Sequence, residues 1–162
     1  MNYTDSLNLL LVLNGVGAVG RVALNTLADR IGPVTVFVPT ALVAGLCVLC
    51  WAAVENIGGL YAWSVFYGIV GGGIQSLFPA GLSSLTTDLR RAGVRMGMVF
   101  TITSFSVLIG PPIAGTLITA TGGRYYAAQA FAGVALLVGT GFIIGARMVL
   151  ARKRGGGWAA KV

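Results

Sequence analysis

The stretch from Ile31 to Val54, IGPVTVFVPTALVAGLCVLCWAAV, contains 24 consecutive residues without a charged side chain. A helix rises about 1.5 Å per residue, so about 20 apolar residues cross the roughly 30 Å hydrocarbon core of a bilayer. Polar and apolar residues do not alternate here, as they do in the strands of a membrane β-barrel. The stretch therefore predicts a membrane-spanning helix.

Four other uncharged stretches flank this one. They contain 15 residues between Asp5 and Arg21, 32 between Glu55 and Asp88, 28 between Arg95 and Arg124, and 22 between Arg124 and Arg147. The last three are long enough to span on their own, and the first is long enough if Arg21 lies inside the membrane. We therefore predict one bundle over residues 1–150, with spans at about 6–28, 34–54, 59–83, 94–119 and 127–149, and a basic cytosolic tail at 151–162.

The composition agrees with this fold class. Charged residues make up 9% of the chain and hydrophobic residues 56%, with a mean hydropathy of +0.88, whereas a soluble domain carries about 25% charged residues. These few polar side chains cannot cover a water-soluble surface. Backbone hydrogen bonds in lipid must close within the protein, which helices do locally. The prediction is an all-α integral membrane protein with the lipid bilayer as its solvent.

The net charge of +7 does not indicate a nucleic-acid partner. Basic residues stand at the ends of the apolar stretches, where they set the orientation of helices in a membrane. They gather in the predicted first and third connections and in the tail: Arg30, Arg90, Arg91, Arg95, Arg152, Lys153, Arg154 and Lys161. We therefore expect the N-terminus outside, the C-terminus in the cytosol, and a multi-pass protein of the plasma membrane.

Two motifs that suggest enzyme chemistry fail on their context. Gly15–Gly20 matches the G-x-G-x-x-G pattern of dinucleotide-binding folds, but no acidic residue ends the next apolar run, as a ribose partner would require. These glycines are better interpreted as close-packing residues of a membrane helix. Cys47 and Cys50 form a C-x-x-C pair, but the chain has no histidine and no third cysteine. We expect neither a metal nor a cofactor.

Arg21 is the candidate binding residue. It lies about eight residues, or roughly 12 Å, from the cytosolic end of its predicted span, and an arginine at a helix centre costs about 2.5–3.5 kcal/mol. Asn14 and Asn25 share its helix face, with Gly17 between them. This polar stripe suits an anion, especially a carboxylate bound by a guanidinium fork. Pairing with a polar group elsewhere and snorkelling to the interface are the alternatives.

Three motifs occur together along the chain. They are Asn14 with Gly20-Arg21, the segment Leu27-Ala28-Asp29-Arg30-Ile31-Gly32-Pro33, and the later Gly110-Pro111-Pro112-Ile113-Ala114-Gly115. This combination resembles the C-terminal half of the monocarboxylate-transporter-like proteins of the major facilitator superfamily, most closely the fungal-type members. The likeness covers nearly the whole chain, as the eighth to twelfth helices of a twelve-helix fold.

The resemblance implies a transporter, not an enzyme, that moves a small organic anion, a monocarboxylate, by alternating access. The family's substrate-binding arginine in the eighth helix matches Arg21, and Asn14 would assist it. Better-known members carry a proton-accepting aspartate four residues earlier, where this chain has Gly17, so proton coupling through this half is not implied. Further candidates for lining a path are Gln75, Ser76, Thr101, Ser104 and Ser106.

The resemblance also suggests gating residues and a helix break. Asp29, Arg30 and Gly32 resemble the family's cytosolic gating loop. Asp88 and Arg95 could form a matching cluster, although ordinary loop charges explain them equally well. Gly110, Pro111 and Pro112 are expected to break the fourth span.

Relative to a twelve-helix fold, the seventh helix and the N-terminal half are absent from this sequence. The missing half is therefore an expected partner, together with the bilayer and the organic anion. The alternative function is that of a non-transporting membrane remnant or interaction partner.

Overall fold

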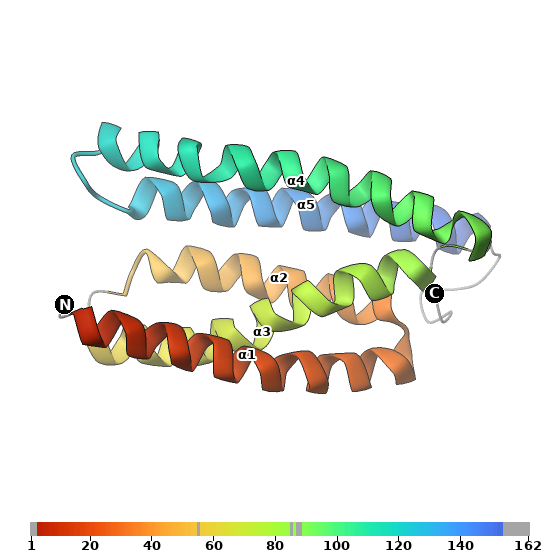
Figure 1. Cartoon of the computed structure of the whole chain (residues 1–162), viewed down its shortest axis with the longest axis horizontal. Coiled ribbons are helices and arrows are strands. Elements are labelled where there is room, and N and C mark those ends of the chain that lie inside the picture. The colour runs from red at the N-terminus through yellow and green to blue at the C-terminus, as the bar shows by residue number, and fades with distance from the viewer. Residues whose placement is uncertain (1–2, 55, 85, 87–88, 154–162) are drawn as a thin grey trace.

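The computed structural model describes residues 3–54, 56–84, 86 and 89–153, and the regular secondary structure of this part is entirely helical. The five helices are α1 (Tyr3–Ile31), α2 (Pro33–Trp51), α3 (Ile57–Ser84), α4 (Leu89–Ala120) and α5 (Tyr126–Lys153) (Figure 1). Each contains a stretch long and apolar enough to cross a membrane. The predicted all-α, five-helix membrane fold is confirmed.

The helix ends differ from the predicted spans by a few residues. α1 extends from Tyr3 to Ile31 instead of 6–28, because the polar residues at its ends continue the helix beyond the apolar stretch. α2 ends at Trp51, three residues early. α5 continues to Lys153, so residues 151–153 of the predicted tail are helical, and residues 154–162 lie outside the described part.

In Figure 1, α4 and α5 lie together on one side of the bundle, and α1, α2 and α3 lie together on the other. α1 and α3 pack along each other most extensively, and α2 packs against both α3 and α5. α4 lies on α5 and has only a small contact with α3. A small core of Ala28, Val36 and Leu77, with Leu24 and Phe37 against it, joins α1, α2 and α3. The parallel pair α1–α3 is thus the most closely built part of the chain.

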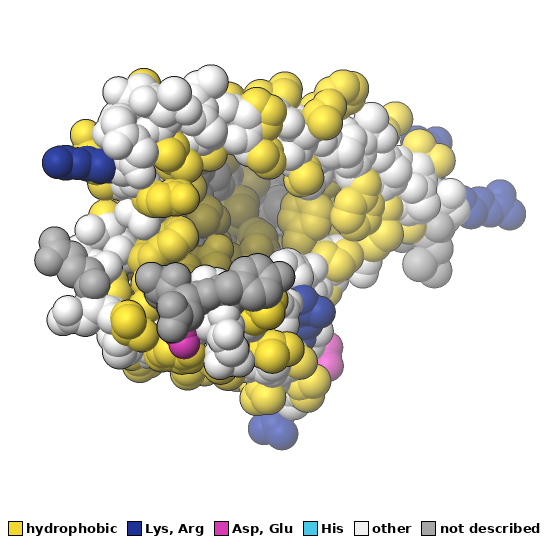
Figure 2. All heavy atoms as spheres, turned by 60° about the vertical axis from the view of Figure 1, so that its left-hand side comes forward, with side chains coloured by type: hydrophobic (Ala, Val, Ile, Leu, Met, Phe, Trp, Pro, Cys, Tyr) yellow, Lys and Arg dark blue, Asp and Glu magenta, His cyan; other side chains and the backbone are white. Residues whose placement is uncertain are grey.

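Large apolar side chains cover much of the outer surface. Leu108 on α4 and Phe142 on α5 are 72% and 77% exposed, and no residue in the most apolar stretch of α4 is buried. Figure 2 shows a hollow lined largely by hydrophobic side chains. Apolar surface of this extent is stable against lipid or against other apolar helices, but not against water.

Two short connections explain where helices stop. Gly32 alone separates α1 from α2 with φ 105°, and Pro33 begins α2 at the position where its missing N–H is not needed. α4 ends in a Schellman motif: the Gly122 N–H donates to the Thr119 carbonyl at 3.2 Å, and the Gly123 N–H donates to the Ile118 carbonyl at 2.9 Å. Gly122 has φ 67°, in the left-handed region.

The predicted break at Gly110, Pro111 and Pro112 does not occur, because α4 continues as one helix from Leu89 to Ala120. The two prolines remove the N–H groups that would bond to the carbonyls of Val107 and Leu108. The turns on either side keep their own hydrogen bonds, and lipid offers the freed backbone no alternative partner. The helix therefore passes through the Gly-Pro-Pro sequence.

Candidate functional site

Glycines bring the backbones of α1 and α3 into direct contact. A Cβ atom on Gly72 would lie 2.8 Å from the Gly17 Cα, and one on Gly20 would lie 2.6 Å from the Ile69 Cα. Larger residues do not fit at this distance, and small residues are what allow close helix approach in membranes. The close-packing interpretation holds for Gly17 and Gly20, whereas a Cβ atom on Gly15 would meet nothing within 4 Å beyond its own helix backbone.

A pocket of about 80 Å³ opens beside this glycine contact. One water needs about 10–15 Å³ of such space, so the pocket admits a carboxylate-sized group. Its lining comes from α1 and α3 only: Leu13, Asn14, Gly17, Arg21, Tyr67, Gly68, Gly71, Gly72 and Gln75. Four of these nine residues are glycines, so five side chains are present to contact a ligand.

Arg21 points from α1 toward α3 within this pocket. It lies ten residues, or about 15 Å, before the last residue of α1, and its Nη2 donates a hydrogen bond to Oε1 of Gln75 at 2.7 Å. In the described part of the chain this is the one hydrogen bond of the guanidinium, which has five N–H donors. The remaining donors are available to a ligand.

The charge of Arg21 is not neutralised by this bond, because Gln75 is uncharged. The acidic residues in the described ranges are Asp5 and Asp29, near the two ends of α1. They lie 16 and 8 residues from Arg21, about 24 and 12 Å along the helix. An uncompensated charge at this depth is costly, and a bound anion would offset that cost.

The predicted polar stripe is only partly present in the pocket. Asn14 lines it together with Arg21, and its Nδ2 donates to the Leu10 carbonyl of its own helix at 2.9 Å. One amide N–H of Asn14 therefore remains for a ligand. Asn25 is half-buried and does not line the pocket.

Of the further path-lining candidates, only Gln75 reaches this pocket. Ser76, Thr101 and Ser104 donate to carbonyls of their own helices, and Ser106 lies in an apolar groove between α4 and α5. The pairing of Gln75 with Arg21 joins residues 54 positions apart, so no spacing in the sequence reveals it. Tyr67 was likewise missed as a pocket residue.

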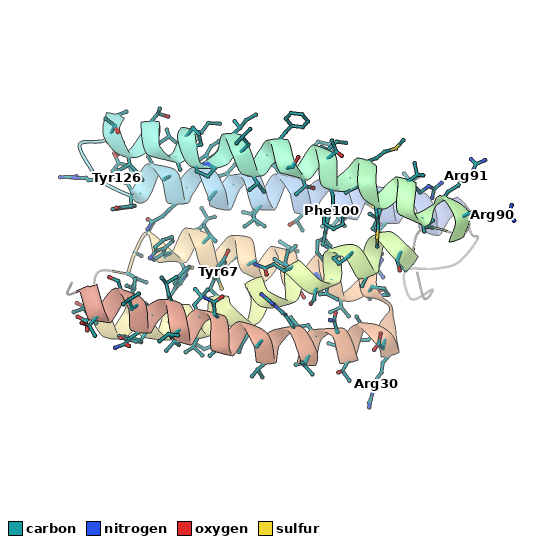
Figure 3. The ribbon with its side chains drawn as sticks, in the orientation of Figure 1. Arg30, Tyr67, Arg90, Arg91, Phe100 and Tyr126 are labelled. Atoms are coloured by element: carbon teal, nitrogen blue, oxygen red, sulfur yellow. The ribbon has the colours of Figure 1, made fainter. Side chains whose placement is uncertain are left out.

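The predicted gating residues lie at one end of the bundle. Asp29 and Arg30 are exposed in the last turn of α1, Gly32 forms the connection to α2, and Arg95 is exposed near the start of α4. Asp88 lies outside the described residues. Figure 3 shows Arg30, Arg90 and Arg91 at this end and Tyr126 at the opposite end. Basic side chains from α1 and α4 thus share one end.

A second arginine contact between helices, made by Arg147 near the end of the last predicted span, is not indicated by the sequence. The Arg147 Nη2 donates to Thr35 Oγ1 at 3.0 Å, which ties α5 to the start of α2. Cys47 and Cys50 are free thiols. No three His, Cys, Asp or Glu side chains come together to hold a metal among the residues that the structure describes.

Comparison with known proteins identifies the family. The family model described as Major Facilitator Superfamily matches residues 4–161. The chain is 55% identical over 148 residues to an "MFS-type transporter" of Gibberella zeae, which covers 91% of this chain and 34% of that protein. It is 35% identical over 151 residues to the MFS-type transporter pynF of Aspergillus niger, 93% of this chain and 35% of that protein.

A third relative is the agnestins efflux protein AgnL12 of Paecilomyces divaricatus, 33% identical over 137 residues, 85% of this chain and 31% of that protein. The chain thus spans about a third of the length of these curated relatives. No solved structure matches it. The relatives are membrane transport proteins and not enzymes. The chain, a multi-pass membrane polypeptide whose described residues form five apolar helices, belongs to the Major Facilitator Superfamily.

Proposed function

We propose that this chain supplies the eighth to twelfth helices, in the C-terminal half, of a transporter that moves an organic anion, a monocarboxylate, by alternating access. The observation that carries the proposal is Arg21: a guanidinium deep in α1 that faces a pocket and has a neutral partner, Gln75. The names of the relatives, transporters and an efflux protein, do not favour the alternative of a non-transporting membrane protein.

The geometry suggests how the anion would be bound. Gln75 fixes one edge of the guanidinium and leaves its charge and its other N–H groups free, which suits a two-pronged hydrogen bond to a carboxylate. The free amide N–H of Asn14 can add a third donor. Asn14 and Arg21 are exposed, so a site between two halves of a transporter could be completed on this face by the other half.

Gly17 is relevant to whether this half of the transporter couples transport to a proton. This position corresponds to the proton-accepting aspartate of related transporters, and a Cβ atom here would lie 3.4 Å from the Gly68 carbonyl oxygen, an ordinary van der Waals distance. Glycine offers no proton-accepting group, and the acidic residues in the described ranges, Asp5 and Asp29, lie near the two ends of α1. If the transporter moves protons with its cargo, the acid belongs to another part of the protein.

The charges at the helix ends support an orientation and a gate. Arg30, Arg90 and Arg91 share one end of the bundle (Figure 3), which the positive-inside rule places in the cytosol. The N-terminus would then lie outside and the C-terminus inside, in the plasma membrane. Asp29, Arg30, Gly32 and Arg95 would form the cytosolic gate, with Asp88 as its further member.

The test is uptake of radiolabelled monocarboxylates by proteoliposomes that contain the transporter of which this chain is part. Loss of one partner from a hydrogen-bonded charge pair costs about 2–5 kcal/mol, so Arg21→Ala should lower uptake about 30-fold or more. Arg21→Lys keeps the charge but loses the fork, and should fall between Arg21→Ala and the wild type.

Arg124→Ala is the matched control. It removes the same side chain from the exposed connection between α4 and α5, and uptake should stay within about twofold of the wild type. Wild-type uptake by the Arg21→Ala protein, inserted at normal levels, would show that Arg21 does not bind the anion.

A further inference from the structure

Three aromatic rings form a stack between α2 and α3. Trp51 of α2 stacks on Trp63 of α3 with ring centroids 4.6 Å apart and an interplanar angle of 20°. Trp63 stacks in turn on Tyr67, one turn further along α3, at 4.8 Å and 9°. The indole Nε1–H of Trp63 donates to the Cys47 carbonyl at 2.7 Å. The hydrogen bond holds the central ring in place, so the stack is a fixed surface.

This aromatic stack reaches the anion pocket. Tyr67, its last ring, lines the pocket of Arg21. Figure 3 shows Tyr67 in the part of the bundle formed by α1, α2 and α3. A Cβ on Gly71, one turn later, would lie 3.3 Å from the Tyr67 ring. The glycine therefore leaves space for the ring. The positive charge and the aromatic surface therefore belong to neighbouring walls of the same α1–α3 groove.

A second pocket, of about 140 Å³, adjoins the first. It is lined by Leu9, Leu10 and Leu13 of α1, by Leu60 and Trp63 of α3, and by Trp51. Its one hydroxyl, that of Ser64, donates to the Tyr61 carbonyl at 2.8 Å, so the lining offers a ligand almost no polar contact. Leu13 lines both pockets.

We propose that the two pockets form one amphiphilic binding site, in which Arg21 binds the carboxylate and the Trp51–Trp63–Tyr67 stack binds an aromatic body of the same molecule. The inference rests on the proposed function and narrows its substrate class. From Leu9 to Arg21 the groove follows twelve residues of α1, about 18 Å. Acids of two or three carbons would fill only the charged end.

An aromatic cargo fits the chemistry of these walls. Offset-stacked rings attract each other beyond the burial of their surface, and rings already held in a stack lose little side-chain freedom when a further ring binds. The apolar lining beside it would favour a ring over a hydrated polar chain. The competing explanation is that the stack only joins α2 to α3, in which case it would influence all acids alike.

The first measurement is a ligand series on the wild-type protein in lipid nanodiscs, by isothermal titration calorimetry. The probes are propionate, 3-phenylpropionate and 3-(2-naphthyl)propionate, with 3-phenylpropionamide as the uncharged analogue of the second. We expect the affinity to rise at least tenfold from propionate to the naphthyl acid, and the amide to bind at least tenfold more weakly than its acid. Equal affinities for propionate and the naphthyl acid would overturn the inference, whatever the variants do.

The second measurement compares Trp63→Phe, Tyr67→Leu and Arg21→Ala. Tyr67→Leu should lower the affinity for the naphthyl acid at least fivefold and leave propionate unchanged. Trp63→Phe removes the hydrogen bond to Cys47 but keeps a ring, so it should lower the melting temperature and keep the preference for aromatic acids. If Tyr67→Leu lowers the affinities for all acids equally, the stack is only structural and the inference fails.

The two proposals fail separately. If no acid binds, or if all acids bind the Arg21→Ala protein as they bind the wild type, the anion site itself is wrong. If the acids bind through Arg21 but without preference for an aromatic body, the anion site stands and only the aromatic subsite is lost.

Discussion

Replacing Gly20 with alanine tests whether the glycine contact sets the distance between α1 and α3. The new Cβ would lie 2.6 Å from the Cα and 2.8 Å from the carbonyl carbon of Ile69, whereas ordinary van der Waals contact begins at 3.4 Å. Both neighbours are backbone atoms and cannot rotate away. The helices must therefore separate locally by at least about 0.8 Å, the difference between 3.4 and 2.6 Å, because the Ile69 carbonyl oxygen lies closer to the new Cβ than the Cα does.

The expected cost follows from two opposing terms. Overpacking of this kind costs about 1–3 kcal/mol, and alanine gains up to about 1 kcal/mol over glycine in helix propensity. Gly15→Ala, five residues earlier in the same helix, gains the same propensity but meets no atom within 4 Å. The difference between the two variants therefore isolates the clash.

The assay is thermal unfolding of both variants in lipid nanodiscs. A change of 1 kcal/mol shifts the melting temperature of a protein of this size by about 2–4 °C, so Gly20→Ala should melt about 2–12 °C below Gly15→Ala. Arg21 adjoins Gly20, so the separation should also lengthen the 2.7 Å bond to Gln75 and weaken anion binding. Equal melting temperatures for the two variants would refute the idea that this contact is tight.

Two further substitutions test the charge of the pocket and the end of α4. Gln75→Glu places a carboxylate against the guanidinium, whose Nη2 lies 2.7 Å from Oε1 of Gln75 in the wild type. The substitution should lower the affinity for 3-phenylpropionate at least about tenfold by neutralising the site. Unchanged affinity by calorimetry would argue against anion binding by Arg21. Gly122→Ala places a Cβ on a residue in the left-handed conformation at φ 67°, and should lower the free energy of unfolding by about 1–2 kcal/mol. Gly122→Asn should lower it less. A wild-type melting temperature for the alanine variant would contradict the Schellman ending.

Part of the site could be predicted because it depends on one helix only. Asn14 and Arg21 lie seven residues apart, which is two helical turns, so periodicity alone places them on one face. The same argument places Asn25 with them, but Asn25 does not line the pocket. Periodicity indicates which residues share a side of a helix, but it cannot indicate how much of that side a neighbour covers.

The fold class, the number of apolar helices in the described residues and the position of Arg21 within the first of them follow from the sequence by itself, since lipid excludes charge and requires helices closed by their own hydrogen bonds. The tertiary structure alone decided the bond of Arg21 to Gln75, the contact of Gly20 with Ile69, and the stack that leads from Trp63 to Tyr67. A helix that is apolar on every side carries no amphipathic stripe to indicate which face meets another helix. Its rotation and its partners are set by close packing and by single hydrogen bonds between residues far apart in the chain.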